Sequence, residues 1–180
     1  MVDRIFPISI GKSSWDGSIK QSWDVQLQES ASGLFRGLVE QDLPSYEYDL
    51  KFPHLDEQEK NAILGFFAQC KGALMPFYIN LGGHIDNQQL AKGTDGKYPF
   101  IKVYGSYVEP IGKVENVTVF VNGVKTTNYT IEGGKLSVAG TGTVTATYDY
   151  YEYVRFGKDL SVKQIFNNLY SVSLKVVTAR

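Results

Sequence analysis

Cysteine, net charge and long apolar runs are all scarce in this sequence of 180 residues. A single cysteine, Cys70, excludes an intrachain disulfide and is typical of a protein made in a reducing cytoplasm. No apolar run approaches the roughly 18 residues of a membrane-spanning helix, and the N-terminus lacks the basic and then apolar build of a signal peptide. With 18 basic and 19 acidic residues, the net charge of -1 argues against a protein that grips nucleic acid through its overall charge.

Motifs that mark catalytic or ligand-binding sites are also missing. The sequence contains no P-loop, no dinucleotide-binding glycine pattern, no Gly-x-Ser-x-Gly and no Cys-x-x-Cys. His54 and His84 stand alone, whereas a metal site usually needs three or four converging ligands. Acidic residues among the tyrosines at 46–49 and 149–152 are more typical of the solvent face of a sheet than of a catalytic carboxylate pair. We therefore predict no catalytic residues, no metal and no cofactor.

The abundant residues favour β structure. The 12 Tyr and 10 Phe, with a second half rich in Thr and Val, suit the half-buried surface of a sheet. Apolar and polar residues alternate at 22–29, 45–52 and 143–150, which predicts strands with one buried face. The pair Asn122-Gly123 between two alternating runs predicts a hairpin. In all, the sequence predicts roughly ten strands.

One segment, at about residues 56–71, has the pattern of an α-helix. Asp56 and Glu59 have the spacing of a capping box at its start, and Gly72 stands where a helix commonly ends. The apolar stripe of this helix consists of Ile63, Phe66, Phe67 and Cys70. A single helical turn is expected at 165–170. The predicted fold is therefore mostly β, of the α+β class: an antiparallel β-sandwich or barrel with one packed helix.

Two polar, aperiodic stretches interrupt the pattern. We predict a single domain over residues 1–180, with a long loop at about 82–98 as the only candidate internal boundary, and a second polar loop at 11–21. Unstructured connections of this length often carry contacts. Because a free loop would expose its apolar side chains, four residues in these stretches are predicted to contact a partner: Trp15, Ile19, Ile85 and Leu90.

Two further expectations concern side chains within strands. The tyrosines of the alternating segments are expected in the core or in a subunit interface rather than in a ligand site: Tyr46, Tyr48, Tyr148 and Tyr150. Arg155 follows a tyrosine-rich strand and precedes Asp159, so we expect a buried charge-assisted pair with an acid. Its predicted role is structural rather than catalytic.

Several segments, in their order and spacing, resemble one known family. The first half supplies Phe6-Pro7 followed by Gly11, then Arg36 in an early strand, then Phe66-Phe67, Gly72 and Phe77. The sharpest match is the strand at 143–160, which runs into Val-Arg-Phe-x-x-Asp-Leu and contains Arg155, Phe156 and Asp159. Together these segments are similar to the distal tail proteins of long-tailed phages and gene transfer agents. The resemblance spans nearly the whole chain.

The resemblance implies a virion structural protein that does no chemistry. Family members form a ring between the tail tube and the baseplate hub. The implied partners are further copies of the chain in a homo-hexamer, the tail tube protein, and the hub and tape-measure proteins. DNA would pass through the lumen without specific binding, and no membrane is involved. The implied location is the phage tail tip, after synthesis in the host bacterial cytoplasm.

Three alternative functions stay open at the level of sequence. A carbohydrate-binding module would stack its Trp or Tyr side chains on host-surface glycans. A glycan hydrolase fragment would need acids such as Asp49 and Glu152. Another tail component, such as a tube or terminator subunit, would share the combination of sheets with one helix.

Overall fold

The computed structural model describes residues 3–14, 17–39 and 41–179. The chain is 60% strand and 9% helical, which confirms the mostly-β α+β class. The described residues form fourteen strands, one α-helix and a short 3₁₀ helix, η1 (Ile10–Lys12). All the paired strands in these residues are antiparallel, and there are more of them than the ten expected. The arrangement as a sandwich or barrel stays a prediction.

The chain divides into two compact units. The first consists of Met1–Gly11 and Pro76–Val154, and the second of Lys12–Met75 and Arg155–Arg180. The chain therefore crosses between the units near residues 11, 75 and 154. The stretch at about 82–98, expected as the candidate boundary, lies inside the first unit.

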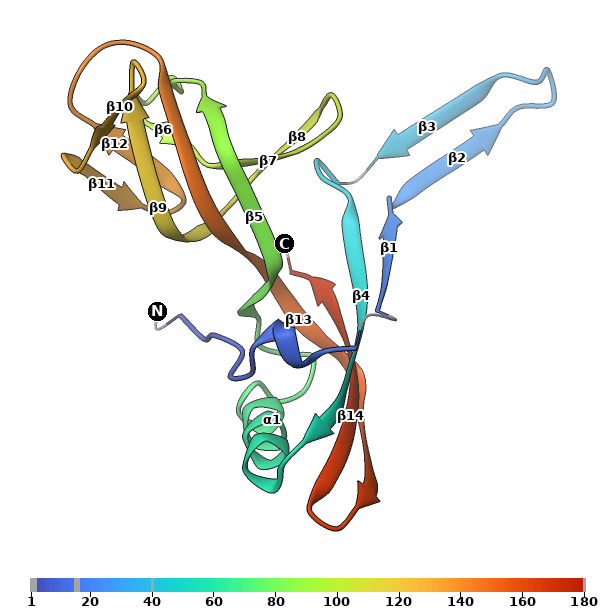
Figure 1. The fold of residues 1–180 in the computed structure, drawn as a ribbon. Coiled ribbons are helices and arrows are strands. Elements are labelled where there is room, and N and C mark those ends of the chain that lie inside the picture. The colour runs from blue at the N-terminus through green and yellow to red at the C-terminus, as the bar shows by residue number, and fades with distance from the viewer. Residues whose placement is uncertain (1–2, 15–16, 40, 180) are drawn as a thin grey trace. The chain divides into compact units, whose positions relative to one another are not determined.

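The first unit contains most of the strands. β13 (Val144–Phe166) lies between β9 and β5, and β10 pairs with β9 (Figure 1). A smaller sheet has the order β11, β12, β6, and β7 pairs with β8 as a hairpin. The bounds are β5 (Phe77–Leu90), β6 (Tyr98–Pro99), β7 (Ile101–Tyr104), β8 (Tyr107–Pro110), β9 (Lys113–Val121), β10 (Val124–Thr126), β11 (Tyr129–Glu132) and β12 (Lys135–Val138).

Local turn signals in this unit are confirmed. Asn122 and Gly123 have φ of 52° and 81° and connect β9 directly to β10. Positive φ at both central residues is the requirement of a tight type I′ hairpin, and Asn-Gly meets it at little steric cost. The core of the unit contains Tyr148 and Phe100, whose rings meet edge to face at 4.8 Å between centroids.

The expected loop at about 82–98 is mostly strand. β5 runs to Leu90, so only residues 91–97 connect it to β6. Leu90 is buried and Ile85 packs against the core, so the expectation that a loop would expose them is wrong. The strand was not recognisable in the sequence because two register shifts interrupt the pairing of β5 with β13. Each shift breaks the alternation that identifies a strand in a sequence.

The second unit contains a sheet in the order β1, β4, β14 and the second half of β13. The helix α1 packs against β14 and β4 (Figure 1), and β2 pairs with β3 as a separate hairpin. The bounds are β1 (Ser18–Ser22), β2 (Val25–Glu29), β3 (Phe35–Val39), β4 (Ser45–Leu55), α1 (Glu57–Gln69) and β14 (Leu169–Thr178).

Two expected segments of this unit differ in the structure. The polar loop at 11–21 ends in β1, where Ile19 lies opposite Tyr48 and is exposed. Trp15 lies outside the described residues. No helical turn forms at 165–170, because β13 continues to Phe166 and turns directly into β14. Asn168, with φ of 57°, allows this tight reversal.

The helix follows its sequence signals closely. Asp56 accepts a hydrogen bond from the backbone of Glu59, and the Glu59 side chain accepts one from the Asp56 backbone, as the capping box predicts. The predicted stripe faces inward: Ile63 and Cys70 are buried, while Phe66 and Phe67 are half-buried against the Phe156 ring. Gly72, with φ of 63°, follows the end of the helix as expected. No helix in the described residues has the length and apolar character needed to cross a membrane.

The residues that carry the family resemblance occupy different environments. Phe6 is buried and its ring stacks on Phe77 with centroids 6.1 Å apart. Phe156 is buried in the second unit. Pro7, Gly11, Arg36, Arg155 and Asp159 are exposed.

The buried charge pair expected at Arg155 is wrong. On β13 the neighbours Val154 and Phe156 are buried, so the alternation of a strand turns Arg155 outward. Among the described residues, no ion pair joins it to Asp159. Of the four tyrosines, Tyr46, Tyr48 and Tyr148 are buried, in agreement with the prediction of a core role.

Candidate functional site

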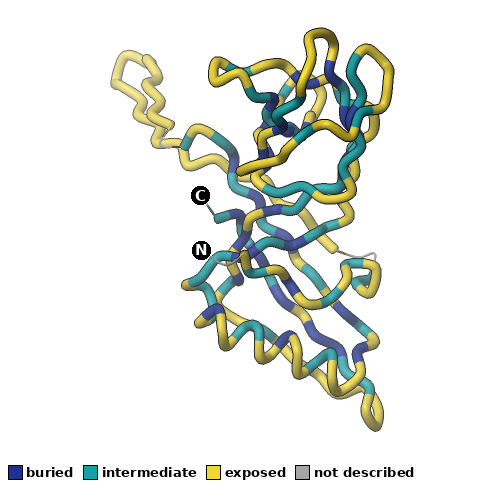
Figure 2. Tube along the Cα trace, turned by 90° about the vertical axis from the view of Figure 1, so that its left-hand side faces the viewer, coloured by how far each residue is buried: buried dark blue, intermediate teal, exposed yellow. Residues whose placement is uncertain are grey.

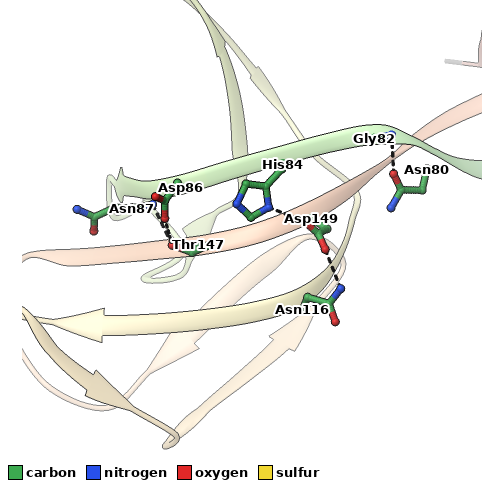
Figure 3. Close-up of polar contacts among 8 residues, drawn as sticks. All are labelled: Asn80, Gly82, His84, Asp86, Asn87, Asn116, Thr147 and Asp149. Carbon is green, nitrogen blue, oxygen red and sulfur yellow. Dashed lines mark hydrogen bonds and ion pairs between the residues drawn. The ribbon is translucent and has the colours of Figure 1, made fainter. Parts of the chain in front are cut away.

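A cluster of hydrogen-bonded polar side chains lies across β5, β13 and β9 of the first unit (Figure 3). Its centre is Asp149 on β13, whose side chain is 27% exposed. Oδ1 of Asp149 lies 2.6 Å from Nδ1 of His84 on β5. Its Oδ2 accepts a 2.7 Å hydrogen bond from Nδ2 of Asn116 on β9. Three strands therefore hold one carboxylate in a fixed orientation.

The same contacts favour the charged form of Asp149. The hydrogen bond from Asn116, followed by that from His84, lowers the pKa of the Asp149 carboxyl below its usual value. Hydrogen bonds to a carboxylate stabilise its anion relative to its protonated form. At neutral pH the cluster therefore contains a charged and oriented hydrogen-bond acceptor that solvent can reach.

A second set of bonds extends the cluster along β13. Thr147 lies two residues before Asp149 and so projects from the same face of the strand. Its Oγ1 donates a 2.7 Å hydrogen bond to Oδ1 of Asp86 and accepts a 3.0 Å bond from the backbone nitrogen of Asn87 (Figure 3). Five polar residues of β5 and β13 thus share one continuous surface.

Bulges in both neighbours of β13 produce this arrangement. Two residues of β5, Asp86 and Asn87, lie opposite Thr147 alone, and two residues of β9, Asn116 and Val117, lie opposite Tyr148 alone. Each bulge contains an asparagine in the left-handed region, with φ of 46° at Asn87 and 51° at Asn116. Bulges re-aim side chains and are frequent beside functional sites. Two bulges opposite successive residues of one strand mark this surface as a candidate site.

A second irregularity of β5 lies beside a hollow next to Asp149. Between Ile79 and Gly83 the pairing with β13 is interrupted, and Oδ1 of Asn80 accepts a 2.8 Å bond from the backbone of Gly82. The hollow has a volume of about 440 Å³. Its walls are the N-terminal segment 5–10, residues 80, 82 and 83 of β5, and the side chains of Asp149 and Tyr151.

Glycine is required at one wall of this hollow. A Cβ atom on Gly83 would lie 2.4 Å from the ring of Tyr150, which is closer than carbon atoms can approach. The Tyr150 ring therefore fills the space that a side chain at 83 would need. Burial, first, and then the neighbouring Tyr104 and Glu152 raise the pKa of Tyr150 to about 12.

A buried ion-pair network is the second polar feature of this unit. Nζ of Lys102 lies 2.9 Å from Oε2 of Glu109 and 2.7 Å from Oε1 of Glu152. All three side chains are buried. Burial disfavours the charge on Lys102, but the two carboxylates outweigh it and raise the Lys102 pKa. Glu152 therefore fixes the β7–β8 hairpin to β13, a role that sequence reasoning did not assign.

The β2–β3 hairpin is the third candidate, and it belongs to the second unit. Every residue of its two strands is exposed (Figure 2). The strand register places its apolar side chains largely on one face: Val25, Leu27, Phe35 and Val39. Leu27 and Phe35 are each 69% exposed. The predicted alternation is therefore present, but no described residue of the second unit covers the apolar face.

Sequence patterns predicted a role for some of these residues and not for others. From the sequence, His84 is an isolated histidine and Glu152 is an acid among tyrosines that a glycan hydrolase could use, and neither is predicted in the contacts described above. Within the described ranges, no three His, Cys, Asp or Glu side chains come together as metal ligands. Ile19 is exposed on β1, whereas Ile85 and Leu90 contribute to the core. The asparagines at the bulges were the available signal, because Asn is the non-glycine residue most often found at positive φ.

No family model matches the chain, and no curated protein matches it in sequence.

Proposed function

We propose that this protein is a virion structural protein of a phage tail, in which copies of the chain form a ring between the tail tube and the baseplate hub. The proposal includes no chemical reaction. Its work is mechanical: one surface of the ring fits the tube and another fits the hub, while DNA passes through the lumen.

The observation that carries the proposal is the uncovered apolar face of the β2–β3 hairpin. An isolated two-stranded hairpin is only marginally stable in water. Its unpaired edges and apolar side chains also invite association with another chain. A hairpin of this kind is expected where a partner covers it.

We assign the covering partner as the neighbouring copy of the same chain. In a ring, each subunit offers the same hairpin and receives that of the next subunit, so that one kind of contact closes the assembly. The six copies follow from the family resemblance. The hairpin contains Glu29 and Arg36, so its polar positions are mixed in charge and do not repel an identical neighbour.

Imaging of purified phage particles tests the proposal. We expect this chain in several copies as a ring at the distal end of the tail tube, with β2–β3 of each copy in contact with the next. Its absence from particles, or its presence as a single copy elsewhere, would refute the ring. Co-expression with the tail tube protein should yield a complex whose mass contains multiple copies.

A further inference from the structure

We propose that the hollow beside Asp149 is a binding site for a neutral saccharide. This inference does not rest on the proposed function, because the hollow lies within the first unit and is defined by that unit's residues alone. With about 440 Å³, it falls within the roughly 300–1,000 Å³ typical of pockets that take small ligands.

The lining of the hollow offers both kinds of hydrogen-bonding group that sugar hydroxyls require. The charged Asp149 accepts one bond at each oxygen, and an ionised carboxylate has about four acceptor positions. The Tyr151 hydroxyl donates to Glu115, so its oxygen is left able to accept. Donors come from the amide nitrogen of Asn80 and from the hydroxyl of Ser9, whose oxygen accepts from a backbone nitrogen.

The N-terminal segment, apart from Ser9, forms an apolar part of the lining. The N-terminal segment contributes Ile5, Pro7 and Ile8 to the hollow, beside the buried Phe6. A pyranose ring has the same division, with C–H groups on one face and hydroxyl groups around its edge. A site with one apolar wall and one wall of mixed donors and acceptors is complementary to that ring.

The charges around the hollow exclude two other classes of ligand. Asp149 is anionic at neutral pH and disfavours a phosphate or carboxylate ligand at the same wall. A divalent cation would need several carboxylate or imidazole ligands. In the described part of the chain, no three such groups converge.

The polar wall is held in place before any ligand binds. His84 and Asn116 orient the Asp149 carboxylate, and the Asn80 side chain is tied to Gly82 in the bulge (Figure 3). Gly83 packs against the Tyr150 ring. Fixed groups lose little conformational entropy on binding, which favours recognition of a ligand as weakly apolar as a sugar.

Titration of the ¹⁵N-labelled full chain with a panel of methyl glycosides tests the proposal. The panel contains the methyl glycosides of glucose, galactose, mannose, rhamnose and N-acetylglucosamine, together with chito-oligosaccharides. We expect at least one of them to shift the backbone amide signals of Gly82, Gly83 and Asp149 in a saturable manner. A panel without any shift at these amides would overturn the proposal, as would shifts confined to other surfaces.

Matched variants sharpen the test. Asp149→Asn removes the charged acceptor and should weaken binding about tenfold or more. Ser9→Ala, at an exposed position on the other wall, should weaken it with no effect on folding. Asp86→Asn is the control, because Asp86 belongs to the same cluster but does not line the hollow. Equal weakening by Asp86→Asn and Asp149→Asn, or unchanged binding in both wall variants, would contradict the assignment.

The two proposals fail in distinguishable ways. Loss of saccharide binding in Asp149→Asn should leave the ring in imaged particles intact. Conversely, a chain that forms no ring could still show the amide shifts. Binding of the single methyl glycosides would identify a site for one sugar unit, whereas binding of the oligosaccharides alone would identify a site for a polysaccharide chain.

Discussion

The hairpins β7–β8 and β2–β3 both expose aliphatic side chains, but they are held in different ways. In β7–β8, Val103 and Val108 lie opposite each other and are 40% and 47% exposed. The adjacent pair, Lys102 and Glu109, points inward and joins Glu152 in a buried network. The β2–β3 hairpin has no such anchor, since all ten residues of its strands are exposed.

The two hairpins obtain their stability from different sources. The β7–β8 hairpin is fixed by charge pairs within its own unit. Removing one member of a buried ion pair leaves an uncompensated charge, which is strongly destabilising. The β2–β3 hairpin has an apolar face that its own unit leaves exposed. The first should therefore respond to substitution through folding, and the second through assembly.

The largest expected effect comes from Lys102→Met. The substitution leaves Glu109 and Glu152 buried without their shared cation, and we expect a loss of about 3–5 kcal/mol in the free energy of unfolding. Urea denaturation measures it. The control is Lys97→Met, which removes an exposed pair with Glu132 and should leave the unfolding midpoint close to that of the unmodified chain. Equal unfolding midpoints for both variants would contradict the contrast between the two hairpins, because they would show that the buried network does not stabilise β7–β8.

Replacing the whole network should restore what the single substitution loses. A triple variant, Lys102→Met with Glu109→Leu and Glu152→Leu, removes all three charges together. Apolar replacements of buried ion pairs are often neutral or stabilising by about 1–4 kcal/mol. We therefore expect the triple variant to unfold at or above the urea concentration of the unmodified chain. A triple variant as unstable as Lys102→Met would show that shape rather than charge governs this site.

In the unmodified chain, alkaline pH should lower the free energy of unfolding of the first unit. Burial, aided by Tyr104 of the β7–β8 hairpin, raises the pKa of Tyr150 to about 12. A tyrosine in an unfolded chain ionises near pH 10. Between these values the folded chain binds more protons than the unfolded chain, so stability is fully present below about pH 10 and falls as the pH rises towards about 12.

Urea denaturation at about pH 9 and about pH 11 measures this change. Tyr150→Phe should reduce the pH dependence, since it removes the group whose ionisation differs between the two states. Tyr151 retains a dependence of its own in this variant, because its hydrogen bond to Glu115 raises the pKa of its hydroxyl to about 12. An identical pH slope in Tyr150→Phe and in the unmodified chain would contradict the assignment.

The sequence predicted those features whose causes are local. The helix at about 56–71 depends on Asp56, Glu59 and an apolar stripe within one segment, and its capping box and buried residues are confirmed. The Asn122-Gly123 turn depends on two adjacent residues and is also confirmed. Such signals act within a few positions of the chain, so one sequence contains all that is needed to read them.

The polar features were not predictable because their partners are distant and their register is irregular. Asp149 meets His84 across 65 positions and Asn116 across 33. The only sign in the sequence of the bulges that align these residues is an asparagine in each bulge. The buried charge was expected at Arg155, yet it lies at Lys102, because alternation on β13 turns Arg155 outward and Glu152 inward. Alternation also identified β2, but it could not show that the apolar face would stay exposed within its own unit.

The smallest expected effect on folding, and a large one on assembly, comes from the β2–β3 hairpin. In Leu27→Ser and Phe35→Ser, the substituted side chain is already exposed to water, so the free energy of unfolding of the isolated chain should change by no more than about 0.5 kcal/mol. If a neighbouring copy buries these side chains, as we propose, each substitution removes apolar contact from every junction of the ring. We therefore expect both variants to remain folded and to form no ring with the tail tube protein.

Gln28→Ser is the matched control, because Gln28 lies on the opposite face of the same hairpin. It should assemble like the unmodified chain, and size-exclusion chromatography with light scattering compares the three variants. Ring formation by Leu27→Ser and Phe35→Ser would show that the apolar face is not the junction. A marked loss of stability in the isolated variants would show that the hairpin is held within its own chain, as β7–β8 is, and would remove the contrast between the two hairpins.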